Sequence, residues 1–245
     1  MHVKSVVALF ILGATALSLI GNGFAEETMK VAVVTGGHSY EKKPFEEMFK
    51  NFEGLECVFL EMEDQRGIFE DISQWPYKAV VLYNMTREIS EKQQENFIKL
   101  LEQGVGFVVL HHAIAAFPDW PEYRKIAGTK YWLEDTVENG VMHPKSQWEE
   151  GVDMRLHVED PAHPIMAGVN DFTVHDETYK GYDLEPDNHL ILSCGEPGSQ
   201  KEVAWTRTYR NAKICLIQPG HGSGAYSNEN FRRMLRQAIQ WVALK

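Results

Sequence analysis

One ten-residue stretch, GVGFVVLHHA at residues 104–113, constrains this chain more than any other. A glycine ends a helical pattern, an apolar and β-branched run follows, and two adjacent histidines, His111 and His112, close the run. Such a run is typical of a fully buried strand in a parallel sheet. Ligands of open α/β sheets bind at the carboxyl ends of the strands, so these imidazoles are the first candidates for chemistry.

The first half of the chain alternates two kinds of hydrophobic pattern. Apolar runs predict strands at residues 29–35, 55–60 and 79–83, and within 104–113. Helical spacing predicts a helix over residues 44–52 and another that follows the capping box of Ser90 and Gln93 and stops at Gly104. Strands that alternate with helices indicate βαβ units, so we expect a mostly parallel sheet with right-handed crossovers.

The second half of the chain has a different pattern. A short helix is expected over residues 122–127, and residues 129–150 are long, aromatic and weakly patterned, as lids and pocket walls often are. Short strands are expected over residues 152–158, 172–174, 190–192, 203–208 and 213–218. Their spacing suggests an antiparallel extension of the sheet. An amphipathic helix from residue 229 onward should pack on that sheet, and residues 26–245 should form one domain.

The first 25 residues are set apart from the fold. Lys4 gives a positive start, residues 6–20 are apolar but short for a membrane span, and residues 23–25 have the small-x-small form of a cleavage site. We therefore expect a signal peptide over residues 1–25, a secreted or periplasmic mature protein, and no membrane attachment after cleavage.

Charge and cysteine content argue against several classes of protein. The formal net charge is −11 and falls by one further unit without Lys4, so nucleic acid is not expected as a partner. No dinucleotide or P-loop glycine pattern occurs, so no nucleotide cofactor is expected. The cysteines, Cys57, Cys194 and Cys215, have no CxxC spacing. Three buried thiols are favoured, and a bridge between Cys194 and Cys215 stays open.

Polar residues gather just after four of the expected strands. The groups are residues 37–40, 111–112, 175–177 and 220–226. Because strand ends converge at one edge of such a sheet, we expect these groups to line a single pocket. Neighbouring strand residues point to opposite faces, so only one of His111 and His112 is expected to reach it.

These groups contain the residue types that hold a divalent metal or move protons. A zinc-like or manganese-like ion would be held by His38, His111, His175 and His221. The same set without metal suits general acid–base catalysis, and the spacing leaves both interpretations open. The catalytic candidates are His111, His112, Asp176 and Glu177. The candidates for contacting substrate are Tyr40, Asn84, Trp120, Tyr179 and Tyr226, although aromatic residues more often build cores.

Residues 36–49, 104–123, 163–182 and 218–235 resemble the ThuA-like (trehalose utilisation) family, and the resemblance covers essentially the whole mature chain. It implies a flavodoxin-like three-layer α/β sandwich, similar to class I glutamine amidotransferases. It also implies that His38, His111, Asp176, Glu177 and His221 occupy recurrent polar positions. Amidotransferases place a cysteine nucleophile on the turn after the central strand, where this chain has histidines, so glutaminase chemistry is not expected.

The resemblance associates the chain with the use of trehalose and related disaccharides, alongside oxidoreductases that convert a sugar hydroxyl to a 3-keto group. A C3 ketone acidifies the C2 hydrogen, so a base can remove it, the glycosidic oxygen can leave C1, and water can add afterwards. In that hypothesis Glu177 or His111 is the base, and Asp176 is an orienting group. His38 and His221 are metal ligands or electrophiles. A small sugar is the expected substrate, and a sugar oxidoreductase is the expected partner.

Two other functions stay open. A non-catalytic periplasmic sugar-binding or accessory module would keep its aromatic walls and lose no function on replacement of His111 or Glu177. Metal-dependent amide hydrolysis is the second alternative, although no zincin motif occurs. An ordinary glycosidase fits less well, because Asp176 and Glu177 are sequence neighbours and no opposing carboxylate is identified.

Overall fold

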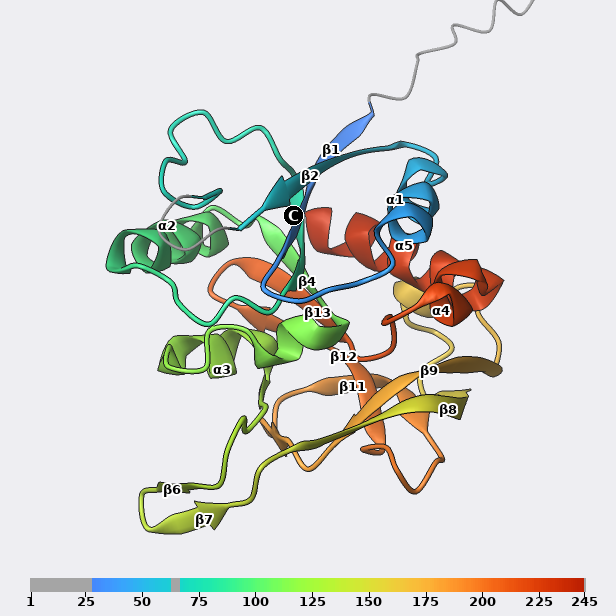
Figure 1. Ribbon diagram of the computed structural model, residues 1–245. Coiled ribbons are helices and arrows are strands. Elements are labelled where there is room, and N and C mark those ends of the chain that lie inside the picture. The colour runs from blue at the N-terminus through green and yellow to red at the C-terminus, as the bar shows by residue number, and fades with distance from the viewer. Residues whose placement is uncertain (1–27, 63–66, 245) are drawn as a thin grey trace, which may run out of the picture.

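The computed structural model describes residues 28–62 and 67–244, and Figure 1 shows how their elements are arranged. The signal peptide expected over residues 1–25 lies outside the described residues. Within the described ranges, no helix is long and apolar enough to cross a membrane.

A nine-stranded sheet runs through the described part of the chain, and one half of it is parallel. In spatial order this half consists of β2 (Leu55–Glu61), β1 (Met29–Gly36), β3 (Ala79–Asn84), β4 (Gly106–Leu110) and β13 (Ala212–Ile217). β3 and β4 are buried along their whole length, which explains their nearly unbroken apolar sequences. The strands predicted for the first half of the chain are confirmed.

The other half of the sheet is antiparallel. It continues from β13 through β12 (Glu202–Tyr209), β11 (His189–Cys194), β8 (Gln147–Val158) and β9 (Phe172–Lys180), which is the edge strand. β8 and β9 form a long ribbon whose register pairs Trp148 with Tyr179 and Met154 with Val174. The expected antiparallel extension is confirmed for β8, β9, β11 and β12. The strand expected over residues 213–218 was grouped with it, and this is corrected: β13 pairs parallel with β4 and antiparallel with β12, so it joins the two halves.

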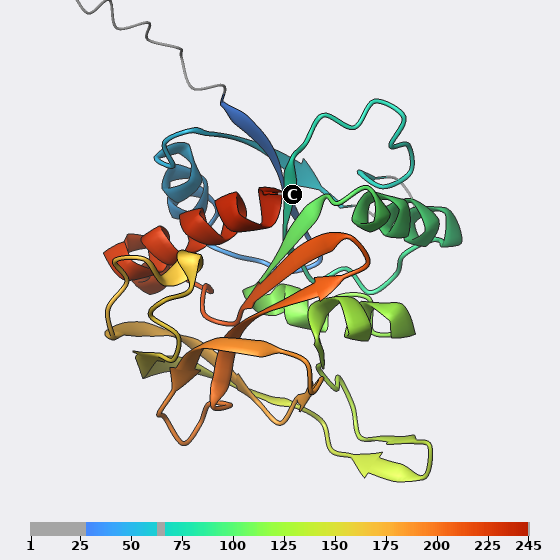
Figure 2. The same ribbon diagram turned by 180° about the vertical axis from the view of Figure 1, so that it is seen from behind.

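Helices cover both faces of the parallel half of the sheet, as Figures 1 and 2 show from opposite sides. One face is covered by α1 (Lys42–Lys50) and α5 (Glu229–Ala243), and the other by α2 (Glu91–Glu102) and α3 (Pro121–Ala127). Phe45 and Phe231 belong to the apolar core on the first face, and Phe97 belongs to the core on the second. The predicted three-layer α/β sandwich is confirmed.

Capping side chains fix the starts of two helices that cover opposite faces. The Ser90 hydroxyl accepts from the N–H of Gln93, whose side chain accepts in return from the N–H of Ser90. At the start of α5, the Asn228 side chain accepts from the N–H groups of Asn230 and Phe231. The predicted capping box is confirmed.

Several short elements were not predicted from the sequence. They are the 3-10 helices η1 (His111–Ala115) and η2 (Pro164–Met166), the strands β5 (Thr129–Lys130), β6 (Thr136–Glu138), β7 (Val141–His143) and β10 (Asp183–Leu184), and the helix α4 (Ser223–Ser227). The β6–β7 hairpin projects from the body of the molecule in both ribbon views (Figures 1 and 2). Residues 129–150 therefore contain short strands and the start of β8.

β9 is longer than predicted, and this corrects the placement of one polar group. The sequence predicted a strand over residues 172–174 with His175, Asp176 and Glu177 just behind it, whereas all three lie inside β9. Charged residues normally interrupt a buried strand. Asp176 and Glu177 are nevertheless buried, because backbone N–H groups and an imidazole from distant parts of the sequence partner them.

The three cysteines are free thiols, so no bridge joins Cys194 to Cys215. Both of these are buried, and Cys57 is partly buried. Burial raises the pKa of the Cys57 thiol to about 12, and burial also raises the pKa of the Cys215 thiol. The cysteines behave as small core residues, as favoured from the sequence.

Candidate functional site

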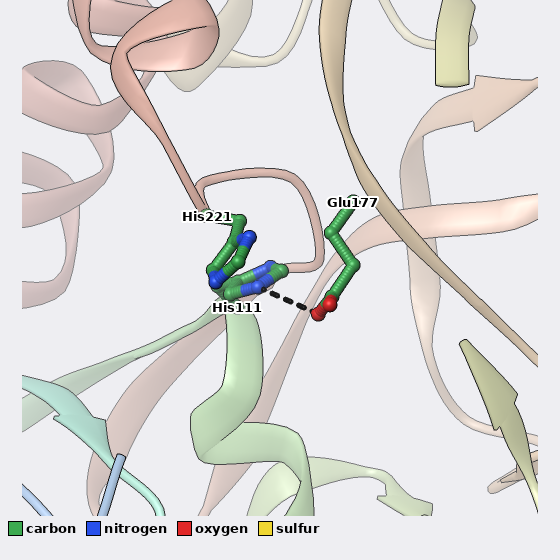
Figure 3. Close-up of side chains that lie close together, drawn as sticks. All are labelled: His111, Glu177 and His221. Atoms are coloured by element: carbon green, nitrogen blue, oxygen red, sulfur yellow. Dashed lines mark ion pairs between the residues drawn. The ribbon is translucent and has the colours of Figure 1, made fainter. Parts of the chain in front are cut away.

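Three side chains from distant parts of the sequence meet at the carboxyl edge of the parallel strands (Figure 3). His111 directly follows β4, His221 follows β13, and Glu177 projects from β9. One potential ligand atom from each residue lies within 4.8 Å of the other two. β4 and β13 are parallel neighbours, which is why two histidines far apart in sequence come together.

The backbone turn at the end of β4 brings both adjacent histidines to the site. His111 has a φ of 52°, in the left-handed region that is uncommon for residues other than glycine, and η1 begins at this residue. The turn ends the alternation of the strand, so the ring centroids of His111 and His112 lie only 5.3 Å apart. Of the two, only His112 lines the cavity that opens beside the cluster, as expected for one of them.

The hydrogen bonds of His111 assign its protons. Its Nδ1 lies 2.7 Å from the main-chain carbonyl oxygen of Gln218, and a carbonyl only accepts, so Nδ1–H donates. In the neutral ring Nε2 then carries the lone pair, and the hydroxyl of Tyr179 donates to it at 2.9 Å. Burial, and then the nearby Glu177, holds the pKa of Tyr179 well above 10.0, so this phenol keeps its proton.

Glu177 places a carboxylate oxygen, Oε1, 3.3 Å from Nε2 of His111. Burial raises the pKa of Glu177, but the hydrogen bonds and charges of His111, Tyr179 and His221 together outweigh burial, so the pKa lies below its ordinary value of 4.5. Glu177 is thus ionised at neutral pH. A carboxylate and an imidazole lone pair repel each other unless a positive charge lies between them. The pair can therefore hold a proton or a metal cation.

His112 and His38 lie beside this cluster. Nε2–H of His112 donates to the carbonyl of Tyr83 at 3.0 Å, while its buried Nδ1 has no hydrogen-bond partner among the described residues. Burial, followed by the imidazoles of His111 and His38, holds the pKa of His112 well below 6.5. His112 is therefore neutral, with its lone pair on Nδ1. The ring centroid of His38 lies 4.5 Å from that of His112 and 5.8 Å from that of His221.

The carboxylate of Asp176 holds the loop that carries His221. It accepts from the main-chain N–H groups of Gly220, His221 and Gly222 at 2.5, 3.0 and 3.1 Å. Asp176 is buried, and these donors replace the water that a carboxylate otherwise binds. Its geometry is that of a positioning residue that acts through His221.

Two tyrosine hydroxyls donate hydrogen bonds to the backbone of the same loop. The hydroxyl of Tyr226 donates to the main-chain carbonyl of His221, and the hydroxyl of Tyr83 donates to that of Gly220 at 2.9 Å. Burial raises the pKa of both phenols, so both remain protonated donors at neutral pH. Tyr226, a candidate for contacting substrate, thus fixes the backbone of the site.

A cavity of about 340 Å³ opens beside the cluster. Its lining includes His38, His112, Tyr131, Glu177, Tyr179 and His221. Cavities of this size accommodate small molecules. The segment 129–150, expected to be a lid or a pocket wall, contributes Tyr131, Trp148 and Glu150 to the lining.

The structure does not bring His175 to the cluster. Its side chain is exposed, and Nδ1 lies 2.7 Å from Oδ1 of Asp153 on β8. Successive strand residues point to opposite faces, so the burial of Asp176 directs His175 outward. The expected metal-ligand set of four histidines must therefore be corrected to exclude His175.

Three candidates for contacting substrate also lie away from the cavity lining. Trp120 is buried in the core with its ring centroid 5.4 Å from that of Phe97. Asn84 is fully buried, and its amide nitrogen contacts Sδ of Met62 at 3.8 Å. Tyr40 packs its ring edge-on against core aromatic rings. None of the three lines this cavity, whereas Tyr179 does.

Trp148 and Glu150 line the cavity but were not among the predicted site residues. Both lie on the part of β8 that precedes the strand predicted from residue 152. The acidic pair Glu149 and Glu150 and the following Gly151 interrupt the apolar alternation there. The only signal in the sequence was the aromatic content of the segment 129–150.

A known family matches nearly the whole described chain. The model of the ThuA family, whose description is trehalose utilisation, matches residues 30–242. No curated protein matches the sequence.

Solved structures share the fold at low sequence identity. A ThuA-like protein of Parabacteroides merdae has a TM-score of 0.73 and 20% identity, over 88% of this chain and 90% of that chain. A ThuA-like protein of Bacteroides uniformis has a TM-score of 0.62 and 16% identity, over 88% and 91%. PurLQS from Thermotoga maritima has a TM-score of 0.57 and 12% identity, over 87% and 99%. The last of these extends the likeness to the class I glutamine amidotransferase-like fold.

Proposed function

The chain belongs to the ThuA family of trehalose utilisation, and on that basis we propose that it cleaves the glycosidic bond of 3-keto derivatives of trehalose or a related disaccharide. The observation that carries the proposal is the convergence of His111, Glu177 and His221 beside a cavity of suitable size. A base, an electrophile and a pocket are what an elimination next to a ketone requires.

The proposed reaction uses the acidity that a C3 ketone gives to the C2 hydrogen. A base takes the C2 proton, and the electron pair forms an enolate on the C3 oxygen. The enolate then expels the oxygen bonded to C1, which takes up a proton and departs as the second sugar. Water adds to C1 of the resulting enone, and C2 regains a proton, so the net change is hydrolysis.

Glu177 is the base in this proposal. It is ionised at neutral pH, and its carboxylate lies beside the cavity with little access to bulk water. His111 stands 3.3 Å away and takes up or shares the proton, while Tyr179 fixes the plane of its ring. A positioned carboxylate that is ionised at the working pH can act as a general base for a substrate held beside it.

The residues present also fit a divalent metal such as zinc or manganese. His111, His221 and one carboxylate oxygen of Glu177 would hold it, which leaves a coordination position for substrate. The second carboxylate oxygen of Glu177 would then be the base, and His111 would be a ligand in place of a proton acceptor. The Nδ1–H of His111 already donates to the carbonyl of Gln218, as metal-ligating histidines commonly do. A bound ion would polarise the C3 ketone and stabilise negative charge on its oxygen. His38 and His112 border the cavity and would contact the sugar.

A 3-keto substrate implies a partner earlier in the sequence of reactions. Sugars carry hydroxyl groups, so an oxidoreductase must first convert the C3 hydroxyl to a ketone. We therefore propose that the protein works with a sugar oxidoreductase, in the secreted or periplasmic location expected from residues 1–25.

The test is turnover of 3-keto-trehalose by the chain from Glu26 onward, with unoxidised trehalose as the control. We expect release of the second sugar from the keto substrate, loss of activity with a chelator, recovery with zinc or manganese, and no cleavage of trehalose. Cleavage of unoxidised trehalose would indicate an ordinary glycosidase. Sugar binding without turnover of either substrate would replace the proposal by a binding module.

Metal-dependent amide hydrolysis is a second candidate. Two imidazoles and one carboxylate are also the ligand set of zinc peptidases, and His111, His221 and Glu177 supply that set. Hydrolysis of small amides by the zinc-loaded protein, with no turnover of keto sugars, would favour this candidate.

A further inference from the structure

The antiparallel ribbon of β8 and β9 has a register that directs two of its side chains to the cavity. Trp148 lies directly opposite Tyr179, and both line the cavity. Between the pairs Glu149–Thr178 and Val152–Asp176, β8 has two residues where β9 has only Glu177. The ribbon therefore contains a β-bulge next to the candidate site.

The bulge consists of Glu150 and Gly151. Gly151 has a φ of +73°, a conformation that suits glycine and bends the strand. Glu150 lies on the cavity side, with Oε1 3.9 Å from Nδ1 of His221. Trp148 and Glu150 thus stand at the cavity with one residue between them on the same strand.

Trp148 is unusual because it lines the cavity and is also 61% exposed. Other exposed large apolar side chains, namely Val137, Val141, Met142 and Leu244, do not line this cavity. Tyr179, by contrast, is buried against His111. Trp148 therefore marks the mouth of the cavity, and Glu177 with Tyr179 marks its inner part.

We propose that Trp148 and Glu150 form a subsite for the sugar ring on the far side of the glycosidic oxygen. This inference rests on the proposed function, because the reacting ring must lie against Glu177 and His111 for its C2 hydrogen to be removed. The second ring of a disaccharide then extends toward the mouth. The indole packs on the C–H face of that ring, and the Glu150 carboxylate accepts from its hydroxyl groups.

The chemistry around Trp148 favours a sugar over an apolar protein surface. On the same face of β8 its neighbour is the acidic Glu150, and the adjacent residues on the opposite face, Gln147 and Glu149, are also polar. An aromatic face beside a hydrogen-bond acceptor matches a polyhydroxylated ring, which has an apolar face and a polar rim.

The test compares a two-ring and a one-ring sugar by calorimetric titration. Trehalose and glucose are the probes, because both bind without turnover in the proposed function. We expect wild-type protein to bind trehalose more tightly than glucose. Trp148→Ala should weaken trehalose binding roughly tenfold and leave glucose binding unchanged. Trp148→Phe should retain part of the preference for trehalose over glucose. Glu150→Gln should also weaken the binding of trehalose and leave the binding of glucose unchanged.

Two matched variants control for unspecific effects. Met142→Ala removes another exposed apolar side chain, on the β6–β7 hairpin, and Glu149→Gln removes the charge next to Glu150 on the opposite face of β8. Neither should change the binding of either sugar. The subsite would be overturned if Trp148→Ala lost affinity for trehalose and for glucose to the same extent, or lost affinity for neither.

The outcomes separate this inference from the proposed function. If Trp148→Ala loses affinity for trehalose alone and the wild-type protein does not turn over keto sugars, the subsite is supported and the proposed reaction is rejected. Turnover of keto sugars with an unchanged trehalose preference in Trp148→Ala would support the reaction and reject the subsite. Failure of the wild-type protein to bind trehalose more tightly than glucose would overturn the subsite, and turnover of keto sugars would still decide the proposed reaction.

Discussion

Nδ1–H of His111 donates to the main-chain carbonyl of Gln218 at 2.7 Å, and this bond decides which nitrogen faces the site. Because Nδ1 keeps its proton, Nε2 carries the lone pair, which accepts from the hydroxyl of Tyr179 at 2.9 Å and lies 3.3 Å from Oε1 of Glu177. A backbone group thus sets the chemical form of the imidazole, independently of solvent. Each of the following predictions depends on this arrangement or on the contacts that hold its neighbours in place.

Replacing Glu177 by glutamine should lower kcat on 3-keto-trehalose by about 10²- to 10⁴-fold, the range that a general base contributes. The amide has the same size as the carboxylate but cannot take up the C2 proton. Steady-state kinetics measure the effect, and thermal unfolding should show a nearly unchanged Tm. Glu149→Gln on the neighbouring strand is the control, and a Glu177→Gln variant with wild-type kcat would remove Glu177 from the mechanism.

Loading with zinc or manganese followed by dialysis should leave about one ion per chain, as measured by elemental analysis. His111→Ala and His221→Ala should each lose the ion, since a site with two ligands left binds weakly. His175→Ala should retain it, because His175 is exposed and paired with Asp153. Equal metal content in all of these proteins would locate the ion elsewhere or exclude it.

Replacing Asp176 by asparagine should destabilise the fold by about 2 kcal/mol, as expected when a buried acceptor of charge-assisted hydrogen bonds is lost. The amide NH₂ would face N–H groups of residues 220–222, which now donate to the carboxylate. Urea unfolding measures the loss. Asp153→Asn, at an exposed position of β8, should change stability by less than about 0.5 kcal/mol. Similar losses of unfolding free energy in Asp176→Asn and Asp153→Asn would contradict the anchoring role of Asp176.

The exposed pair of His157 and Asp171 gives a pH prediction with a defined sign. The hydrogen bond and then the charge of Asp171 raise the pKa of His157 above its ordinary value of 6.5. The stabilisation by this pair is therefore full at pH values below 6.5 and is lost as the pH rises through the raised pKa of the folded state. An NMR titration should show the raised pKa, and Asp171→Asn should return it toward 6.5. An unchanged titration in the variant would show that the pair does not form in solution.

The sequence was sufficient to place His111 and His221, because both follow apolar strands of the parallel half. Apolar runs, glycine exits and the capping box at Ser90 are local signals, and each depends on neighbouring residues alone. The mostly parallel sheet with right-handed crossovers follows from these signals because βαβ units have few ways to pack, whereas the three-layer sandwich was implied by the family resemblance.

The contribution of β9 could not be predicted in the same way. Asp176 is buried only because a loop more than 40 residues away turns three N–H groups toward it. The opposite directions of His175 and Asp176, and the cavity-facing position of Glu150, depend on the pairing register of β8 with β9. Register is set by long-range contacts, so composition and periodicity in one segment do not reveal it.

The left-handed backbone of His111 has a consequence for the balance between stability and function. A residue with a Cβ in this conformation is strained by about 1 kcal/mol relative to glycine, which adopts it freely. His111→Gly would relieve that strain while removing the imidazole, so the gain at the turn would be offset by the loss of the contacts to Gln218 and Tyr179. The strain at this turn is thus the energetic cost of presenting an imidazole at the point where β4 ends.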